Sequence, residues 1–149
     1  MKIYLDNCCF NRPYDDLSSE TIKMEAEAKL MIQNLVLHKK LHLIWSFVLS
    51  LENNDNLDEM KKADISQWES LSDTYAPANP DIEKHAISLE AAGIKPKDAA
   101  HLACAIHSGA RFFITTDRKL MRKSKSIVDS MEIVNPIEFI AILEGKNEK

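Results

Sequence analysis

Four acidic residues lie at positions where a carboxylate could take part in chemistry, namely Asp6, Glu52, Asp98 and Asp117. Several carboxylates in one pocket repel one another and raise each other's pKa values, so such a cluster persists mainly where a cation neutralises it. Oxygen ligands of this kind select the hard ions Mg²⁺ or Mn²⁺. A metal held in this way can activate a water molecule and stabilise negative charge on a phosphate. If the four acids converge, they predict a metal-dependent hydrolytic centre.

Each acid also has an ordinary structural explanation. An aspartate that follows a strand, as Asp6 follows the apolar run Ile3-Tyr4-Leu5, is usually a turn or cap residue. An aspartate in the first turn of a helix complements the helix dipole, which accounts for Asp98 and Asp117. An exposed glutamate on a helix is usually just solvated. The prediction therefore depends on a fold that brings the four side chains together.

The segments around these acids alternate between strand and helix patterns. Short apolar, β-prone runs predict strands over residues 3–6, 41–45, 112–115 and 133–134. Helical spacing, with caps or prolines at the starts, predicts helices over residues 19–38, 47–52, 57–72, 81–92, 96–107 and 136–143. Asp117 is expected to start one further helix, which is basic.

This alternation predicts an α/β fold, a three-layer sandwich whose central, mainly parallel sheet has four to five strands covered by helices on both faces. We expect one domain over residues 1–144 and a polar tail over residues 145–149. In open α/β sheets, sites form outside the carboxyl ends of the strands, where Asp6 and Asp117 are expected. The same edge of the sheet is the expected meeting point for all four acids.

The charge balance is mildly acidic, with a formal net charge of −4. A protein that grips nucleic acid through its phosphates alone is usually basic, so this chain either avoids nucleic acid or binds it through a local basic patch and metal ions. Residues 118–125 offer such a patch, because five of the eight are basic; a solvated helix face is the alternative. Arg118 and Lys119 are candidate phosphate ligands, and so is Arg12 in the loop after the first strand.

Three uncharged side chains near the acids are further candidates. Asn7 could hold a metal-bound water or could merely cap the strand before it. Thr116, which we favour over Thr115, could donate a hydrogen bond to substrate, although β-branched residues are common in strands. His101 follows Asp98 by three residues and shares its helix face, so a general base is conceivable. We favour instead a histidine that packs near the site or bonds a backbone carbonyl.

The cysteines indicate the compartment. There are three, Cys8, Cys9 and Cys104, and the adjacent pair does not have the spacing of a zinc site. So small and odd a number argues against a disulfide framework and favours a reducing compartment, the cytoplasm. We expect no signal peptide, since Asp6 interrupts the short apolar run at the start. No apolar run approaches the about 20 residues that a membrane span requires.

Four segments together resemble a PIN domain, in the order in which that family carries its acids, and the resemblance extends over essentially the whole chain. These segments are Ile3–Asp6, Ser46–Asn53, Lys95–Ala103 and Phe113–Asp117. The third and fourth, with Lys-Pro-Lys-Asp-Ala-Ala-His-Leu-Ala and Phe-Ile-Thr-Thr-Asp, are the most specific. The second is loose, so Glu52 has the weakest support.

The resemblance implies an α/β sandwich and Mg²⁺- or Mn²⁺-dependent cleavage of RNA, with metal held by Asp6, Asp98 and Asp117 and with Glu52 as the fourth catalytic acid. Many small bacterial members are toxins of toxin–antitoxin pairs, similar to the VapC ribonucleases; these usually form homodimers and are inhibited by an antitoxin. Many members carry a further acid shortly after the fourth. Here no acid follows before Asp129, so the resemblance supports one metal ion and leaves a second open.

Two other functions compete with this one. A haloacid-dehalogenase-like phosphatase could use Asp6 as a nucleophile, but such enzymes want a second aspartate two residues later, where this chain has Cys8. A non-catalytic PIN-like module could bind RNA or a protein without cutting. The retained acids argue against such a module, and the missing further acid argues mildly for it.

Overall fold

A five-stranded parallel sheet forms the centre of the computed structural model, which describes residues 1–11 and 19–147. The strand order is β3-β2-β1-β4-β5, and every neighbouring pair is parallel. The strands are β1 (Lys2–Leu5), β2 (His42–Ser46), β3 (Thr74–Ala76), β4 (Phe112–Ile114) and β5 (Glu132–Val134). Because the strands are parallel, their carboxyl ends share one edge of the sheet.

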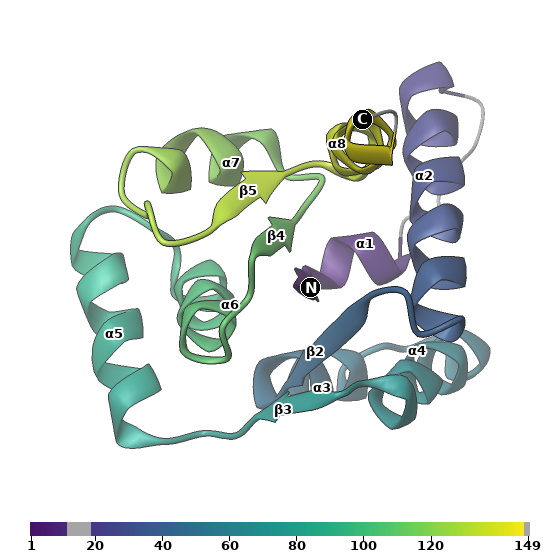
Figure 1. The fold of residues 1–149 in the computed structure, drawn as a ribbon. Coiled ribbons are helices and arrows are strands. Elements are labelled where there is room, and N and C mark those ends of the chain that lie inside the picture. Colours follow the sequence, from purple (N-terminus) through teal and green to yellow (C-terminus); the bar gives the residue numbers. More distant parts are fainter. Residues whose placement is uncertain (12–18, 148–149) are drawn as a thin grey trace.

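Helices cover both faces of this sheet. They are α1 (Asn7–Asn11), α2 (Glu20–Leu37), α3 (Phe47–Asn54), α4 (Glu59–Leu71), α5 (Pro80–Ala91), α6 (Pro96–His107), α7 (Arg118–Lys125) and α8 (Pro136–Asn147). In Figure 1, α2 and α8 pack together on one side of the sheet, whereas α5 and α6 pack together on the other. The predicted α/β sandwich with a parallel sheet of four to five strands is confirmed.

The central strands form because their residues are apolar on both faces. Ile3, Tyr4 and Leu5 of β1 are all fully buried, as are the three residues of β4. Strands with helices on both sides read as continuous apolar runs rather than as an alternation, which is the pattern that the sequence has here.

Most helices begin at the local signals that the sequence carries. The Ser46 hydroxyl accepts a hydrogen bond from the Leu49 N–H at the start of α3, and Asn79 caps α5 in the same way through Ile82 N–H. Pro96 occupies the first position of α6, where its missing N–H costs nothing. The predicted range 96–107 for this helix is therefore the observed one.

Three elements differ from the sequence expectation. The sequence predicts no helix over residues 7–11 and no strand over residues 74–76, where the structure has the short helix α1 and the edge strand β3. Both are too short to show a periodic pattern, and β3 is defined only by its pairing with β2. Helix α8 continues to Asn147 rather than ending at Leu143, so residues 145–147 are helical.

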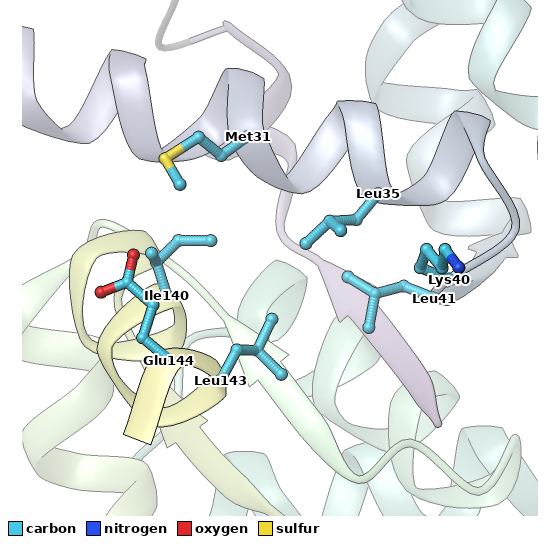
Figure 2. A pocket seen from close by; sticks show the side chains of 7 residues that line it. All are labelled: Met31, Leu35, Lys40, Leu41, Ile140, Leu143 and Glu144. Atoms are coloured by element: carbon cyan, nitrogen blue, oxygen red, sulfur yellow. The ribbon is translucent and has the colours of Figure 1, made fainter. Parts of the chain in front are cut away.

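An apolar groove of about 470 Å³ lies between α2 and α8. Figure 2 shows Met31 and Leu35 on α2 facing Ile140 and Leu143 on α8. Lys40, Leu41 and Glu144 complete the lining. None of these residues is one of the four candidate acids. Within residues 1–11 and 19–147, no helix is both long enough and apolar enough to cross a membrane.

Candidate active site

Asp6 extends the end of β1 at the carboxyl edge of the sheet. Its backbone N–H donates to the Ile114 carbonyl oxygen at 2.9 Å, so the ladder with β4 continues one residue past the strand. Its side chain is nearly buried and is held on both sides, because Oδ1 accepts from the Asn7 N–H at 2.8 Å and Oδ2 accepts from the Thr115 hydroxyl at 2.8 Å. The carboxylate therefore has a fixed orientation, with Asn7 beginning α1 directly beside it.

Thr115 links the first of the four acids to the last. Besides donating to Asp6, its buried hydroxyl accepts from the Asp117 N–H at 3.1 Å. The parallel register that pairs Leu5 with Ile114 places Thr115 next to Asp6. Thr116, the threonine favoured from the sequence, is half-buried, and its N–H donates to the Cys8 Sγ at 3.4 Å. The sequence did not predict the bond of Thr115 to Asp6, although its place directly after a strand was a usable signal. The preference for Thr116 as a donor to substrate stays a prediction.

Asp117 caps helix α7. Its Oδ1 accepts from the N–H groups of Lys119 and Leu120 at 3.0 and 3.1 Å. Both bonds use Oδ1, so the cap itself does not require Oδ2. The ordinary explanation for this aspartate is thus correct, and it is compatible with a second role for the exposed carboxylate.

Asp98 lies in the first turn of α6 and is half-buried. Burial raises the pKa of its carboxyl, and the negative charges of Asp6 and Asp117 raise it further, against the opposing effect of His101 and Lys95. The side chains of Asp98 and Asp117 line a small cavity of about 60 Å³ together with Lys95 and Lys119, among others. The fold thus brings Asp6, Asp98 and Asp117 close enough to affect one another electrostatically.

Glu52, on α3, meets the other acids through His101. Its Oε1 accepts a hydrogen bond from the His101 Nε2, and that nitrogen also lies 3.8 Å from the Asp6 Oδ1. Burial alone would raise the pKa of Glu52. The bond and charge of His101, with contributions from Lys97 and the side chain of Asn7, outweigh burial and lower it. The fold therefore brings the weakest of the four sequence candidates to the same edge as the other three.

His101 is a buried residue that packs beside Glu52 and Asp6, which is one of the two alternatives that the sequence favoured. The other alternative, a backbone carbonyl partner, is wrong, because Nε2 bonds Glu52 and Nδ1 lies 2.5 Å from the Tyr4 hydroxyl. Burial would lower the pKa of His101, but Glu52, Asp6 and Asp98 outweigh that effect and raise it. Its position three residues after Asp98 was the signal that it belonged to the site.

The basic residues of α7 lie beside the acids. Arg118 and Lys119 are both exposed in the first turn of the helix. A second hollow, of about 410 Å³, is lined by Lys119, Arg122, Lys123 and Ser126. Because Lys119 and Lys123 also line the small cavity at Asp98 and Asp117, the basic surface adjoins the acidic one. Arg12 lies outside the described residues.

The side-chain atoms at this site are of the type that hard divalent cations prefer as ligands. Asp6, Asp98 and Asp117 offer only carboxylate oxygens, and their mutual repulsion at Asp98 is the kind that a cation relieves. Across the part of the chain that the structure describes, however, no three His, Cys, Asp or Glu side chains lie close enough to share one ion as they stand. Coordination by all three aspartates would therefore require their side chains to move together.

Comparisons with known proteins agree with this architecture. Residues 3–126 match the family model of the PIN domain. A chain in the structure of VapBC2 from Rickettsia felis bound to a DNA fragment from their promoter has a TM-score of 0.58 at 14% sequence identity, covering 91% of this chain and 98% of that one. A chain in the VapBC-1 structure from nontypeable Haemophilus influenzae has a TM-score of 0.56 at 18% identity, with coverage of 91% and 98%. No curated protein matches the sequence. At such identities, the structural similarity establishes the fold alone.

Proposed function

Because this chain belongs to the PIN-domain family, we propose that it is a metal-dependent endoribonuclease that hydrolyses RNA phosphodiester bonds. The observation that carries the proposal is the meeting of four acids at one edge of the sheet, from the ends of β1 and β4 and from α3 and α6. Their separation along the chain makes this gathering a property of the fold. Acids that only capped their own helices would not be expected to lie close to one another.

In this proposal Asp6, Asp98 and Asp117 hold one Mg²⁺ or Mn²⁺ ion, directly or through water. When bound, the ion supplies positive charge that offsets the phosphate and makes a nearby water a better nucleophile. We propose a single ion because no acid follows Asp117 before Asp129.

The remaining residues bind and orient. Glu52 would orient the attacking water, and Asn7, which helps to lower the pKa of Glu52, would hold a metal-bound water or the substrate. Arg118 and Lys119 would bind phosphates of the substrate strand beside the acids, with Thr116 as a further hydrogen-bond donor and with Arg12 as a candidate from the sequence. Attack by water in this arrangement leaves a 5′-phosphate and needs no covalent enzyme intermediate.

Cleavage of RNA with and without EDTA tests the proposal. We expect wild-type protein to cut RNA in Mg²⁺ or Mn²⁺ and to stop when EDTA is added, and Asp6→Asn to abolish cleavage while keeping the fold. Asp129→Asn, at an exposed acid outside the site, is the matched control and should cut as wild type does. If purified Asp6→Asn cuts as fast as wild type, the assignment of the site is wrong.

The non-catalytic alternative predicts a different result. A module that only binds RNA or protein should bind Mn²⁺ poorly, and it should leave RNA intact at every metal concentration. Calorimetric titration with Mn²⁺ separates the two functions, because the nuclease should give a saturable isotherm that Asp6→Asn weakens.

We further propose that this nuclease is the toxin of a toxin–antitoxin pair, that it acts in the cytoplasm as a homodimer, and that an antitoxin protein inhibits it. The VapBC complexes that share its fold support a protein partner, and the free thiols of Cys8, Cys9 and Cys104 suit a reducing compartment. Induced expression should arrest growth, and Asp6→Asn should not. Growth unaffected by active protein would exclude the toxin role and leave the nuclease in place.

A further inference from the structure

We propose that Tyr4 and His101 are positioning residues that hold Glu52 beside Asp6, in a chain of hydrogen bonds built into the sheet. The inference rests on the proposed function, because it assigns these residues to the same site. Neither side chain is acidic. The sequence alone predicts Tyr4 only as a strand residue, and it favours a His101 that packs near the site or bonds a backbone carbonyl.

The chain of bonds uses both nitrogens of a buried imidazole. His101 is 1% exposed, its Nδ1 lies 2.5 Å from the Tyr4 hydroxyl, and its Nε2 bonds Glu52. The Tyr4 hydroxyl in turn lies 2.6 Å from the Ser46 Oγ. Four elements are thereby joined, since Tyr4 is on β1, Ser46 on β2, Glu52 on α3 and His101 on α6.

The direction of the bond to Glu52 does not depend on the charge of the imidazole. An ionised carboxylate only accepts, so Nε2 must carry the proton and donate. The Tyr4 hydroxyl can donate to a neutral Nδ1 or accept from a protonated one, and the Ser46 hydroxyl can likewise accept or donate. The chain is therefore satisfied in either state of the ring, and Nε2–H points at Glu52 in both.

Tyr4 is the fixed member of this chain, between Ser46 and His101. Its ring is fully buried and stacks on Phe113 of β4, with centroids 5.3 Å apart and planes at 8°. The His101 ring meets it edge-on at 5.6 Å. Tyr4 thus takes its orientation from two central strands, whereas the side chain of Glu52 is 18% exposed at the site.

The imidazole also lies between two carboxylates that would otherwise repel. Its Nε2 bonds Glu52 and lies 3.8 Å from the Asp6 Oδ1. Without an N–H at this point, Glu52 would face Asp6 with only the weaker contributions of Lys97 and Asn7 to offset the repulsion, and would turn toward solvent. Tyr4 therefore acts on Glu52 only through His101, and it has no surface with which to touch substrate.

Tyr4→Phe tests the proposal, because it removes the hydroxyl and keeps the stacked ring. Residues that orient the side chains of a metal site typically contribute about 10- to 100-fold to activity or metal affinity. We expect a fall of that size in kcat with KM unchanged, and no further fall when Tyr4→Phe is added to Glu52→Gln. Losses that multiply in the double variant would overturn the proposal, since they would mean that Tyr4 does not act through Glu52. Tyr75→Phe, at a half-exposed tyrosine on β3, is the control.

Two substitutions of His101 provide a second test. A glutamine at this position can still donate an N–H toward Glu52, whereas an alanine cannot. We expect His101→Gln to keep more of kcat than His101→Ala. Equal losses in two folded variants would count against the proposal.

A measurement on metal-free protein separates this inference from the proposed function. The ¹⁵N chemical shifts of the His101 ring should indicate a proton on Nε2, and Tyr4→Phe should shift the Nδ1 signal while Tyr75→Phe does not. If the ¹⁵N chemical shift of Nδ1 is the same in Tyr4→Phe as in wild type, the inference is overturned, even if the protein is an active nuclease. If wild type cuts no RNA but the shift occurs, the hydrogen-bond chain stands and the proposed function fails.

Discussion

Thr115 illustrates how a neutral residue can organise charged ones. Its hydroxyl donates to Asp6 and accepts from the Asp117 N–H, so a single buried oxygen fixes both the carboxylate at the end of β1 and the start of α7. A carboxylate that accepts hydrogen bonds on both oxygens keeps one orientation. Preorganisation at this scale depends on the partners of the acids as much as on the acids.

Replacing Thr115 with valine should cost both stability and activity. The side chains have the same shape, so the change removes the hydrogen bonds to Asp6, to the Asp117 N–H and to the Cys8 Sγ. It leaves one Asp6 oxygen less well satisfied in a nearly buried place. The expected loss is about 1–3 kcal/mol in the free energy of unfolding, measured by urea denaturation of metal-free protein.

The same variant should also lower kcat for RNA cleavage. Thr74→Val, in the edge strand β3, is the matched control and should change neither quantity appreciably. A Thr115→Val protein that is as stable and as active as wild type would show that this hydroxyl does not organise the site.

Helix α2 contains a buried lysine that destabilises the folded protein. Lys29 is fully buried, its Nζ finds no hydrogen-bond partner among the described residues, and it lies 4.0 Å from the centroid of the Phe10 ring. Burial lowers the pKa of Lys29 to about 8, while the nearby Cys9 and Cys8 thiols oppose that shift. A cation over an aromatic face recovers only part of what water would provide.

Lys29→Met should therefore stabilise the protein at neutral pH. A pKa that falls from 10.5 in the unfolded chain to about 8 in the fold corresponds to a penalty of about 3 kcal/mol. Below about pH 8 both states are protonated and the penalty is fully present. Above it the folded state loses its proton first, so wild-type stability rises toward pH 10.5.

Urea denaturation across this pH range checks both the sign and the window. The advantage of Lys29→Met should be largest at pH 7 and should shrink as the pH rises. Lys23→Met, at an exposed position of the same helix, should give no such pH-dependent gain. An advantage that is constant with pH would mean that methionine helps by packing alone.

Helix α7 should contribute mainly to the affinity for the substrate. Lys119 and Lys123 line both the cavity at Asp98 and Asp117 and the adjoining basic hollow. Replacing both with glutamine should raise KM for a single-stranded RNA and leave kcat nearly unchanged. The slope of log(kcat/KM) against log salt should also decrease, by about 0.7 for each phosphate that a lysine no longer neutralises.

Lys23→Gln combined with Lys84→Gln, at exposed lysines on α2 and α5, is the matched control for charge. It changes the net charge without touching the surface beside the acids. An equal rise in KM in this control would mean that overall charge, and not the α7 surface, sets the affinity for RNA.

At the scale of the whole molecule, the site depends on the parallel sheet as a unit. The acids come from the ends of β1 and β4 and from α3 and α6, and no two of them are close in sequence. The molecule has a net charge of −4, and yet the face beside the acids is basic. Bound metal should therefore add a connection between parts of the fold that Thr115 and His101 already join by hydrogen bonds.

Mn²⁺ should raise the melting temperature of the wild-type protein. At a metal concentration of 100 times Kd, binding to the folded state alone adds about 2.7 kcal/mol, which corresponds to a rise of about 5–10 °C for a chain of this size. Asp98→Asn should lose most of that rise. In the absence of metal it should melt above wild type at pH 7, because it removes repulsion from Asp6 and Asp117.

Thermal melts with Mn²⁺ and with EDTA measure both effects, and Asp129→Asn is the control for charge. The difference between Asp98→Asn and wild type in EDTA should narrow as the pH falls through the raised pKa of Asp98, since wild type then becomes neutral there too. A full Mn²⁺ shift in Asp98→Asn would place the ion elsewhere.

The sequence by itself determined the features that depend on neighbouring residues. Continuous apolar runs identified β1, β2, β4 and β5, and the proline at position 96 fixed the start of α6, because caps and strand patterns act over a few residues. The alternation of these elements was sufficient to predict the parallel sheet. Because Asp6 and Asp117 follow strands, the sequence also predicted that the acids lie at the carboxyl edge of the sheet.

Only the tertiary structure decided what depends on pairing across the fold. Strand β3 exists through its register with β2, and Thr115 reaches Asp6 through the register of β1 with β4. Tyr4, Glu52 and His101 are far apart along the chain and show no shared pattern, yet the core brings their polar atoms into contact. Such contacts follow from how layers pack rather than from local propensity, so a sequence pattern could name the acids and could place His101 near Asp98, but it could not identify the atoms that hold the acids in place.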